Sequence, residues 1–391
     1  MYLTAIPLAY HDDDHFWGRD MGLLARGMRA NGVDARVVAI GDRGKYSPDL
    51  PLILGSREDL ENPQWWRDLA PDGVILNTWS APRYDAIRKA VLKATPRVME
   101  KLDTGGVRSP RVWFGNYMLQ TYGGYLDSNS PLKRALAPVV APVRTWVTRY
   151  LPELLDKRMA SSMSLMPLLA AESPIAVTRI QRYLRHYHNE IPKVVCIPHP
   201  VADDYMHWDE GHPKENRIVS VGRWDSFQKN FPLLVKVLTE FLRIHPDWSA
   251  DIVGTLPENW QSVIAQSDEF QRIRFLGRLE HREISTIYQR AKIFLISSRY
   301  ESFNIAAAEA LCCGCSVVGP ADIGSVPFFT GSDSGTSACR QTFAHFLDAL
   351  NAETDQWNAD ARNPDSISKH WLPKVGATAV AAKVLELIKK L

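Results

Sequence analysis

Short apolar segments alternate with longer helical patterns along the second half of the chain. This alternation restricts the possible folds more than any other feature of the sequence. The segments RIVSVG, SADIVG, IRFLG, AKIFLISS and CSVVG are nearly continuous in apolar residues. Such strands are typical of parallel sheets that are buried on both faces. Between them we expect helices over Pro232–His245, Glu258–Glu269, Arg282–Arg290 and Asn304–Cys313. The pattern predicts a doubly wound α/β domain.

The first half of the chain shows a similar alternation. YLTAIPLAY, DARVVAIG, DGVILNTWS and PRVMEKLD read as strands, and SPIAVT and KVVCIP as two more around the helical run RIQRYLRHYH. We therefore predict a second α/β domain, so that two doubly wound Rossmann-like domains would face a cleft. In open sheets of this kind, ligands bind beyond the carboxyl ends of the strands.

Domain boundaries follow from a polar segment rich in turn residues, VADDYMHWDEGHPKEN. A chain of 391 residues is also too long for one ordinary core. We predict an N-terminal domain over 1–197, a linker over 198–216 and a C-terminal domain over 217–372. The last segment, 373–391, reads as an amphipathic helix that could pack back on the N-terminal domain.

Composition excludes several classes of protein. A net charge of +2 argues against a role that depends on neutralising nucleic-acid phosphates. No apolar run reaches the 18 residues of a spanning helix, and no basic leader precedes the first apolar run. The five cysteines are odd in number, and Cys312, Cys313 and Cys315 read as buried thiols rather than as a zinc site. These features indicate a cytoplasmic protein.

Glu309 is the only charged residue between Ser302 and Ala321. A buried carboxylate without a partner is costly, so it needs a partner in the protein or in a ligand. Glu301 lies eight residues earlier, and the helix expected between them would begin with free N–H groups that favour a phosphate. A sugar at Glu301, a diphosphate at the helix start and a ribose at Glu309 would together make a nucleotide-sugar site.

A second motif, VSVGRWDSFQKNF, places two cations after a strand. Arg223 follows the strand end at Gly222, and Lys229 precedes a helix that Asn230 would cap and Pro232 would open. A lysine at a helix N-terminus opposes the helix dipole unless an anion binds there. The two cations are either a diphosphate clamp or a solvated surface pair.

The order VGR…KN followed by RYESFNIAAAEALCCG resembles the C-terminal half of retaining glycosyltransferases of family 4, which have the GT-B fold. That family's signature is a glutamate, seven residues and a second glutamate. The resemblance is specific from about Ser173 to Gly319. It implies that Arg223 and Lys229 bind the donor diphosphate. It also implies that the phosphate oxygens face the backbone N–H groups of Phe303, Asn304 and Ile305.

The resemblance implies further roles for the donor half. Glu301 would face the donor sugar, with Arg223 and Lys229 beside it in catalysis, and Glu309 would bind the ribose. The backbone near Gly277 and Arg278 would meet the base. It also implies a UDP- or GDP-sugar as co-substrate, no bound cofactor, and no need for a metal.

The N-terminal half departs from the family in its first loop, AYHDDDHFWGRD, which lacks the usual glycine pair. His11, Asp14 and His15 in this loop could contact the acceptor, bind a metal or face solvent. Asp103, after a strand and before two glycines, could line the cleft or cap a turn. His199 stands where the family usually has asparagine and reads as a structural hinge residue.

The stretch 131–155 carries four basic residues among many apolar ones. It could contact an anionic membrane surface, which would make the protein peripheral at the cytoplasmic face. The alternative is a pair of packing helices broken at Pro138 and Pro142.

The resemblance as a whole implies a retaining transferase that moves a sugar from a nucleotide-diphosphate sugar to a hydroxyl of a glycan or glycolipid in surface polysaccharide biosynthesis. Two alternatives stay open: a non-catalytic nucleotide-sugar-binding protein, and a nucleotide-sugar epimerase, which would release an isomerised donor without an acceptor.

Overall fold

A computed structural model describes residues 1–10, 13–18, 20–41, 46–153, 155–260, 270–331 and 333–391. Most of the helix expected over Glu258–Glu269 therefore lies outside the described residues. Contacts divide the chain into two compact units. The first consists of Met1–Tyr117, Val143–Ala202 and Lys374–Leu391, and the second of Met118–Pro142 and Asp203–Pro373.

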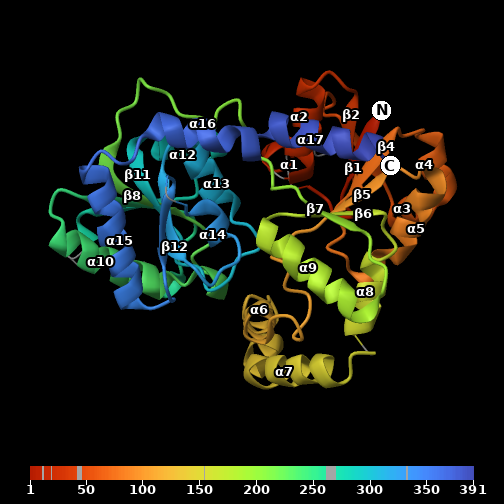
Figure 1. Cartoon of the computed structure of the whole chain (residues 1–391), viewed down its shortest axis with the longest axis horizontal. Coiled ribbons are helices and arrows are strands. Elements are labelled where there is room, and N and C mark those ends of the chain that lie inside the picture. The colour runs from red at the N-terminus through yellow and green to blue at the C-terminus, as the bar shows by residue number, and fades with distance from the viewer. Residues whose placement is uncertain (11–12, 19, 42–45, 154, 261–269, 332) are drawn as a thin grey trace. The chain divides into compact units, whose positions relative to one another are not determined.

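In the described residues, the first unit holds a seven-stranded parallel sheet in the order β3-β2-β1-β4-β5-β6-β7 (Figure 1). Its strands are β1 (Tyr2–Ala5), β2 (Ala35–Ile40), β3 (Leu52–Gly55), β4 (Gly73–Leu76), β5 (Val98–Lys101), β6 (Leu168–Ala171) and β7 (Lys193–Cys196). Alternate strand residues enter two separate apolar clusters, so the sheet is buried on both faces.

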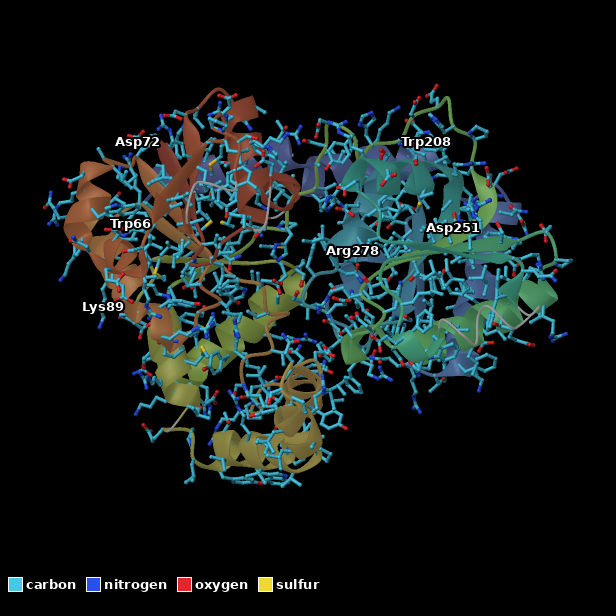
Figure 2. All side chains as sticks on the ribbon, turned by 180° about the vertical axis from the view of Figure 1, so that it is seen from behind. Trp66, Asp72, Lys89, Trp208, Asp251 and Arg278 are labelled. Carbon is cyan, nitrogen blue, oxygen red and sulfur yellow. The ribbon has the colours of Figure 1, made fainter. Side chains whose placement is uncertain are left out.

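The helices of the first unit are α1 (Asp13–Trp17), α2 (Asp20–Ala30), α3 (Arg57–Glu61), α4 (Pro63–Asp68), α5 (Asp85–Ala94), α8 (Asp156–Met163), α9 (Pro174–Tyr187) and α17 (Ala377–Lys389), with the 3-10 turn Pro82–Tyr84. Trp66 on α4 fills one cluster (Figure 2). Helix α17 packs on α2, where a Cβ at Gly27 would overlap the Ala377 carbonyl and Asn31 Nδ2 donates to the Thr378 carbonyl at 2.9 Å.

The second unit holds a six-stranded parallel sheet in its described part, in the order β10-β9-β8-β11-β12-β13. Its strands are β8 (Glu215–Val221), β9 (Ser249–Val253), β10 (Ile273–Gly277), β11 (Ala291–Leu295), β12 (Ser316–Pro320) and β13 (Gly335–Ala338). Its helices are α10 (Phe231–Ile244), α12 (His281–Arg290), α13 (Ile305–Cys312), α14 (Val326–Phe329) and α15 (Phe343–Asn358), with the 3-10 turn Phe227–Lys229; α16 (Pro364–Val375) leads back to the first unit.

A buried carboxylate ties three strands of this second sheet together. Asp251 on β9 accepts hydrogen bonds from Arg217 on β8 at 3.0 Å and from Arg274 on β10 at 2.7 Å (Figure 2). With both sheets parallel and helices packed on them, the predicted fold of two Rossmann-like α/β domains is confirmed.

Two helices, α6 (Phe114–Leu126) and α7 (Pro131–Tyr150), begin in one unit and end in the other. The sequence assigned 118–142 to the N-terminal domain, whereas contacts group it with the second unit. The expected break at Pro138 and Pro142 is wrong, because α7 runs through both prolines. Each proline removes one hydrogen bond, but its fixed φ suits a helix.

The strand expected at SPIAVT is also wrong, because these residues begin helix α9. Ser173 caps that helix by accepting from Ala176 N at 3.2 Å, and Pro174 occupies its first turn. The β-branched residues suggested a strand, but serine followed by proline is a helix-start signal that outweighs their propensity. The strand itself is β6, just before the cap.

Candidate functional site

Parallel pairing of β8 with β11 brings two loops of the second unit together. Ile218 pairs with Ile293 and Val219 with Phe294, so both strands end at the same edge of the sheet. Beyond that edge, Arg299 N donates to the Gln228 carbonyl at 2.8 Å. The loops that carry the two predicted motifs, separated by about seventy residues in the sequence, are therefore directly hydrogen-bonded.

Glu301 accepts four hydrogen bonds at this junction. Its donors are Lys229 Nζ at 2.6 Å, Gln228 Nε2 at 3.0 Å, Ser298 Oγ at 2.6 Å and Asn304 Nδ2 at 3.3 Å. The Glu301 side chain is only 6% exposed and that of Lys229 is 18% exposed. A carboxylate held by four donors is fixed in position, and it neutralises the nearest predicted cation.

Lys229 uses one of its three N–H donors on Glu301 in this structure. Its methylenes pack against Gly222, where a Cβ would come within 3.2 Å of Lys229 Cδ. Arg223, directly after that glycine, is exposed. The structure thus brings Lys229 to Glu301 and leaves Arg223 at the surface of the same loop.

Helix α13 begins beside this ion pair. Asn304 has a left-handed backbone, with φ of 75°, and its side chain caps the helix by accepting from Ala307 N at 3.0 Å. Phe303 is buried and Ile305 opens the first turn. N–H groups in the first turn of a helix have no acceptor within the helix, so this turn can bind an anion.

Glu309 lies inside α13 and is buried. The Tyr288 hydroxyl on α12 donates to its Oε2 over 3.4 Å, which is a long hydrogen bond. Burial raises the pKa of Glu309 to about 7, and the Tyr288 hydroxyl only partly offsets this. This carboxylate is therefore held far less well than Glu301 and is suited to accept hydrogen bonds from a ligand.

Glycines line the ends of the neighbouring strands. Gly254 N donates to the Gly277 carbonyl at 2.6 Å, and a Cβ at Gly254 would overlap the carbonyl oxygen of Gly222. Gly277 has a φ of 66°, and no atom lies near the place of a Cβ there. Arg278 follows it and is exposed (Figure 2). The backbone at these strand ends is accessible to a ligand.

The first unit has its own cluster of charged groups at strand ends. His199 Nδ1 lies 3.0 Å from Asp20 Oδ2 and from Lys101 Nζ, and its Nε2 lies 3.5 Å from Asp103. Burial alone would lower the pKa of His199, but Asp20 and Asp103 raise it to about 9. Asp103 is the most accessible member of the cluster, with its side chain 39% exposed.

The other residues predicted to contact the acceptor of the sugar cannot be placed in that cluster. His11 lies outside the described residues, and for Asp14 and His15 the structure describes only the backbone, in α1. Within the described part of the chain, no group of three or more histidine, cysteine or acidic residues could hold a metal ion. No helix of that part is long and apolar enough to cross a membrane.

Residues 204–333 match the family described as Glycosyl transferases group 1. The chain contains a glycosyl transferases group 1 domain. This domain includes Arg223, Lys229, Glu301 and Glu309, but neither the His199 cluster nor α6 and α7.

Two relatives illustrate the similarity in sequence. Phosphatidyl-myo-inositol mannosyltransferase of Propionibacterium freudenreichii is 28% identical over 175 residues, which cover 43% of each chain. D-inositol 3-phosphate glycosyltransferase of Corynebacterium aurimucosum is 27% identical over 150 residues, 36% of this chain and 35% of that protein. The chain thus matches less than half the length of either relative.

Solved structures share the fold along the whole chain. Sucrose-phosphate synthase from Thermosynechococcus elongatus aligns with a TM-score of 0.63 at 15% identity, over 100% of this chain and 98% of that one. HepE of Anabaena, in complex with UDP-glucose, aligns with a TM-score of 0.64 at 13% identity, over 100% and 99%. These similarities concern the fold, which is that of GT-B glycosyltransferases.

Sequence reasoning about the glycosyl transferases group 1 domain missed several contacts of its predicted residues. Gln228 and Ser298 bind Glu301, and Tyr288 binds Glu309. Gln228 lies within the first motif and Ser298 directly precedes the second, so their positions could have suggested them. Tyr288 looks like an ordinary core residue of an amphipathic helix.

The Cys312, Cys313 and Cys315 thiols beside Glu309 are buried, as predicted. Cys315 Sγ donates to the carbonyls of Tyr288 at 3.1 Å and Ala291 at 3.2 Å.

We expect Glu309→Gln to raise the melting temperature at pH 8. The raised pKa means that stability falls as pH rises from about 4.5 to 7, since the buried carboxylate must ionise. Ionisation of Glu309 lowers the free energy of unfolding by on the order of 3 kcal/mol at pH 8, and this loss vanishes near pH 4.5. Glu301→Gln is the control and should lower the melting temperature at pH 8, because Lys229 loses its anion. Equal melting curves for wild type and Glu309→Gln would contradict the raised pKa.

We expect His199 to stabilise the first unit in its charged form. Its pKa of about 9 exceeds the unfolded value of 6.5, so its contribution is complete below pH 6.5 and is lost as pH rises through 9. Denaturant unfolding between pH 6 and pH 10 measures this, with a loss on the order of 3 kcal/mol from this group. His199→Asn should flatten the pH dependence, and an unchanged profile in that variant would show that other groups cause it.

Proposed function

We propose that the chain is a retaining glycosyltransferase that uses a nucleotide-diphosphate sugar. The observation that carries this proposal is the Lys229–Glu301 ion pair beside the start of α13, with a poorly satisfied Glu309 in the same helix. The fixed Glu301 carboxylate, a helix start suited to an anion and the buried Glu309 carboxylate all lie in one domain. This domain, over 204–333, matches a glycosyltransferase family.

In this proposal the donor diphosphate binds between the two loops. Arg223 and Lys229 supply positive charge, and the N–H groups of Phe303, Asn304 and Ile305 face its oxygens. Lys229 has donors left after binding Glu301, so it can hold a phosphate oxygen and the carboxylate together. These positive groups neutralise the diphosphate, and we propose that the reaction needs no bound cofactor or metal.

The rest of the donor extends along α13 and the strand ends. Glu309 accepts from the ribose hydroxyls, and the backbone at Gly277 and Arg278 contacts the base. Glu301 faces the donor sugar. Its four hydrogen bonds hold the carboxylate in one position, so it orients sugar hydroxyls rather than acting as a mobile base.

The proposed reaction exchanges one bond at the anomeric carbon for another on the same face of the sugar. The bond from this carbon to the leaving diphosphate oxygen breaks, and a bond to the acceptor hydroxyl oxygen forms. The hydroxyl proton passes to the leaving phosphate. Arg223, Lys229 and the helix start stabilise the negative charge that develops on that phosphate.

We propose a UDP- or GDP-sugar as donor, and a glycan or lipid-linked acceptor of surface polysaccharide biosynthesis at the cytoplasmic membrane face. UDP-glucose is bound by HepE, and one relative carries the name of a mannosyltransferase that acts on phosphatidyl-myo-inositol, a lipid. Asp103 is the acceptor-side candidate, with His11, Asp14 and His15 from the first loop.

Thermal stability against UDP, GDP, ADP, TDP and their common sugar conjugates tests the donor site. A ligand at about 100 times its dissociation constant adds about 2.7 kcal/mol to stability. We expect a shift with one uridine or guanosine donor, which Glu309→Ala and Lys229→Ala abolish and the surface control Glu240→Ala retains. No shift with any nucleotide would reject the proposal, and release of an isomerised donor without acceptor would indicate an epimerase. The anomeric configuration of the product, read by NMR, tests retention.

A further inference from the structure

Helix α7 has its large apolar side chains on the outside. Its buried positions hold small residues, namely Ala137, Ala141, Thr145 and Thr148. Its exposed positions hold large ones, which are between 44% and 68% exposed: Leu132, Leu136, Val139, Val143, Trp146 and Tyr150. A surface helix of a water-soluble domain normally has the opposite arrangement. We call the six exposed residues the apolar stripe.

The apolar stripe is continuous along the whole helix. Its members follow one another at steps of four and three residues, which keeps them within an arc of about 80° at 100° per residue. The buried small residues occupy the opposite side by the same count. From Leu132 to Tyr150 the stripe is about 27 Å long. Exposed apolar residues scattered singly need no explanation, but a stripe of this length does.

The charged residues around the apolar stripe are all basic. From Ser128 to Pro152 the sequence contains Lys133, Arg134, Arg144 and Arg149 and no acidic residue. By helical position Lys133 and Arg144 flank one side of the stripe and Arg149 the other. Trp146 and Tyr150, with ring centroids 5.1 Å apart, stack at one end.

We propose that the apolar stripe of α7 binds an anionic bilayer surface, with the helix lying in the plane of the interface. Apolar residues framed by basic ones, with aromatic rings at the boundary, match the chemistry of an anionic headgroup region. A second copy of the helix would instead bring its four positive charges against the same four. This inference deepens the membrane contact of the proposed function, but its test requires no turnover.

The test is flotation of the full chain with vesicles of phosphatidylglycerol and phosphatidylcholine, or of phosphatidylcholine alone. We expect binding to the anionic vesicles, reduced at least tenfold by Leu136→Glu with Val143→Glu. The matched control, Leu8→Glu with Ile244→Glu, alters two residues of similar exposure elsewhere and should bind within twofold of wild type. Lys133→Gln with Arg144→Gln should remove the preference for anionic lipid.

Three results would overturn the inference: no vesicle binding by wild type, equal binding by the Leu136/Val143 variant, or a dimer that this variant dissociates. The last would show that a second copy covers the stripe. Nucleotide-induced thermal shifts of the same samples keep the two proposals apart, because the stripe variant should retain them. If the Leu136/Val143 variant loses vesicle binding but keeps its nucleotide-induced thermal shifts, both the membrane-binding stripe and the nucleotide-sugar site are supported.

A separate contact concerns the turn that carries Lys229. Asp127, directly after α6, accepts from Ser226 Oγ and from Phe227 N, each at 2.8 Å. The Tyr122 ring packs on Phe227 with a centroid separation of 5.3 Å. Phe227 begins the 3-10 turn that ends at Lys229. We infer that Asp127 is a positioning residue for the donor loop, acting through this turn on the Lys229–Glu301 pair.

This second inference rests on the proposed donor site, and nucleotide affinity measured by calorimetry tests it. We expect Asp127→Ala to weaken the affinity for the preferred nucleotide sugar at least fivefold, whereas the exposed control Asp355→Ala should stay within twofold of wild type. Asp127→Asn keeps an acceptor and should restore part of the affinity. Equal affinity in wild type and Asp127→Ala would overturn the positioning role alone, whereas no nucleotide binding by wild type would overturn both the donor site and this role.

Discussion

The pairing of β8 with β11 is the constraint on which the candidate site depends. These strands are neighbours in the sheet but distant in sequence, and their parallel pairing makes their following loops meet. The two loops then share a backbone hydrogen bond and the Lys229–Glu301 ion pair. A shift of this register by one residue would reverse the faces of β11 and separate Glu301 from Lys229.

The two carboxylates of the site are stabilised in opposite ways. Glu301 has four donors, so its charge is satisfied before any ligand arrives, and its geometry is preorganised. Glu309 has one long hydrogen bond and a raised pKa, so its charge is a standing cost to the fold. In the proposed function, ribose hydroxyls remove that cost on binding. Under the same proposal, Glu301 is the rigid orienting group of the domain, and Glu309 gains its missing hydrogen bonds from the ligand.

Much of the second unit could be predicted from the sequence, because buried parallel strands leave near-continuous apolar runs and their connecting loops carry the charged motifs. The hydrogen-bond partners of Glu301 are partly predictable, because Gln228 lies within the first motif and Ser298 directly precedes the second. Asp127 was not, since its contacts cross about 100 residues and no local pattern marks them. The strand predicted at the start of α9 is wrong, because β-branched residues favour a strand locally while the Ser173–Pro174 signal starts a helix. The break predicted in α7 is wrong, because both prolines lie within one continuous helix.

The segment between β5 and β6 carries both inferred features, and it lies outside the matched domain. Asp127 directly follows α6, and α7 begins at Pro131, so the two helices are closely tethered. If lipid binding by α7 favours the conformation in which Asp127 holds the Lys229 turn, the coupling must be reciprocal. Nucleotide binding would then strengthen lipid binding by the same factor. Among the described residues, no long flexible loop separates α7 from Asp127, so none is available to absorb a displacement of α7. Under both inferences, the segment between β5 and β6 would therefore link membrane binding to the position of the donor loop.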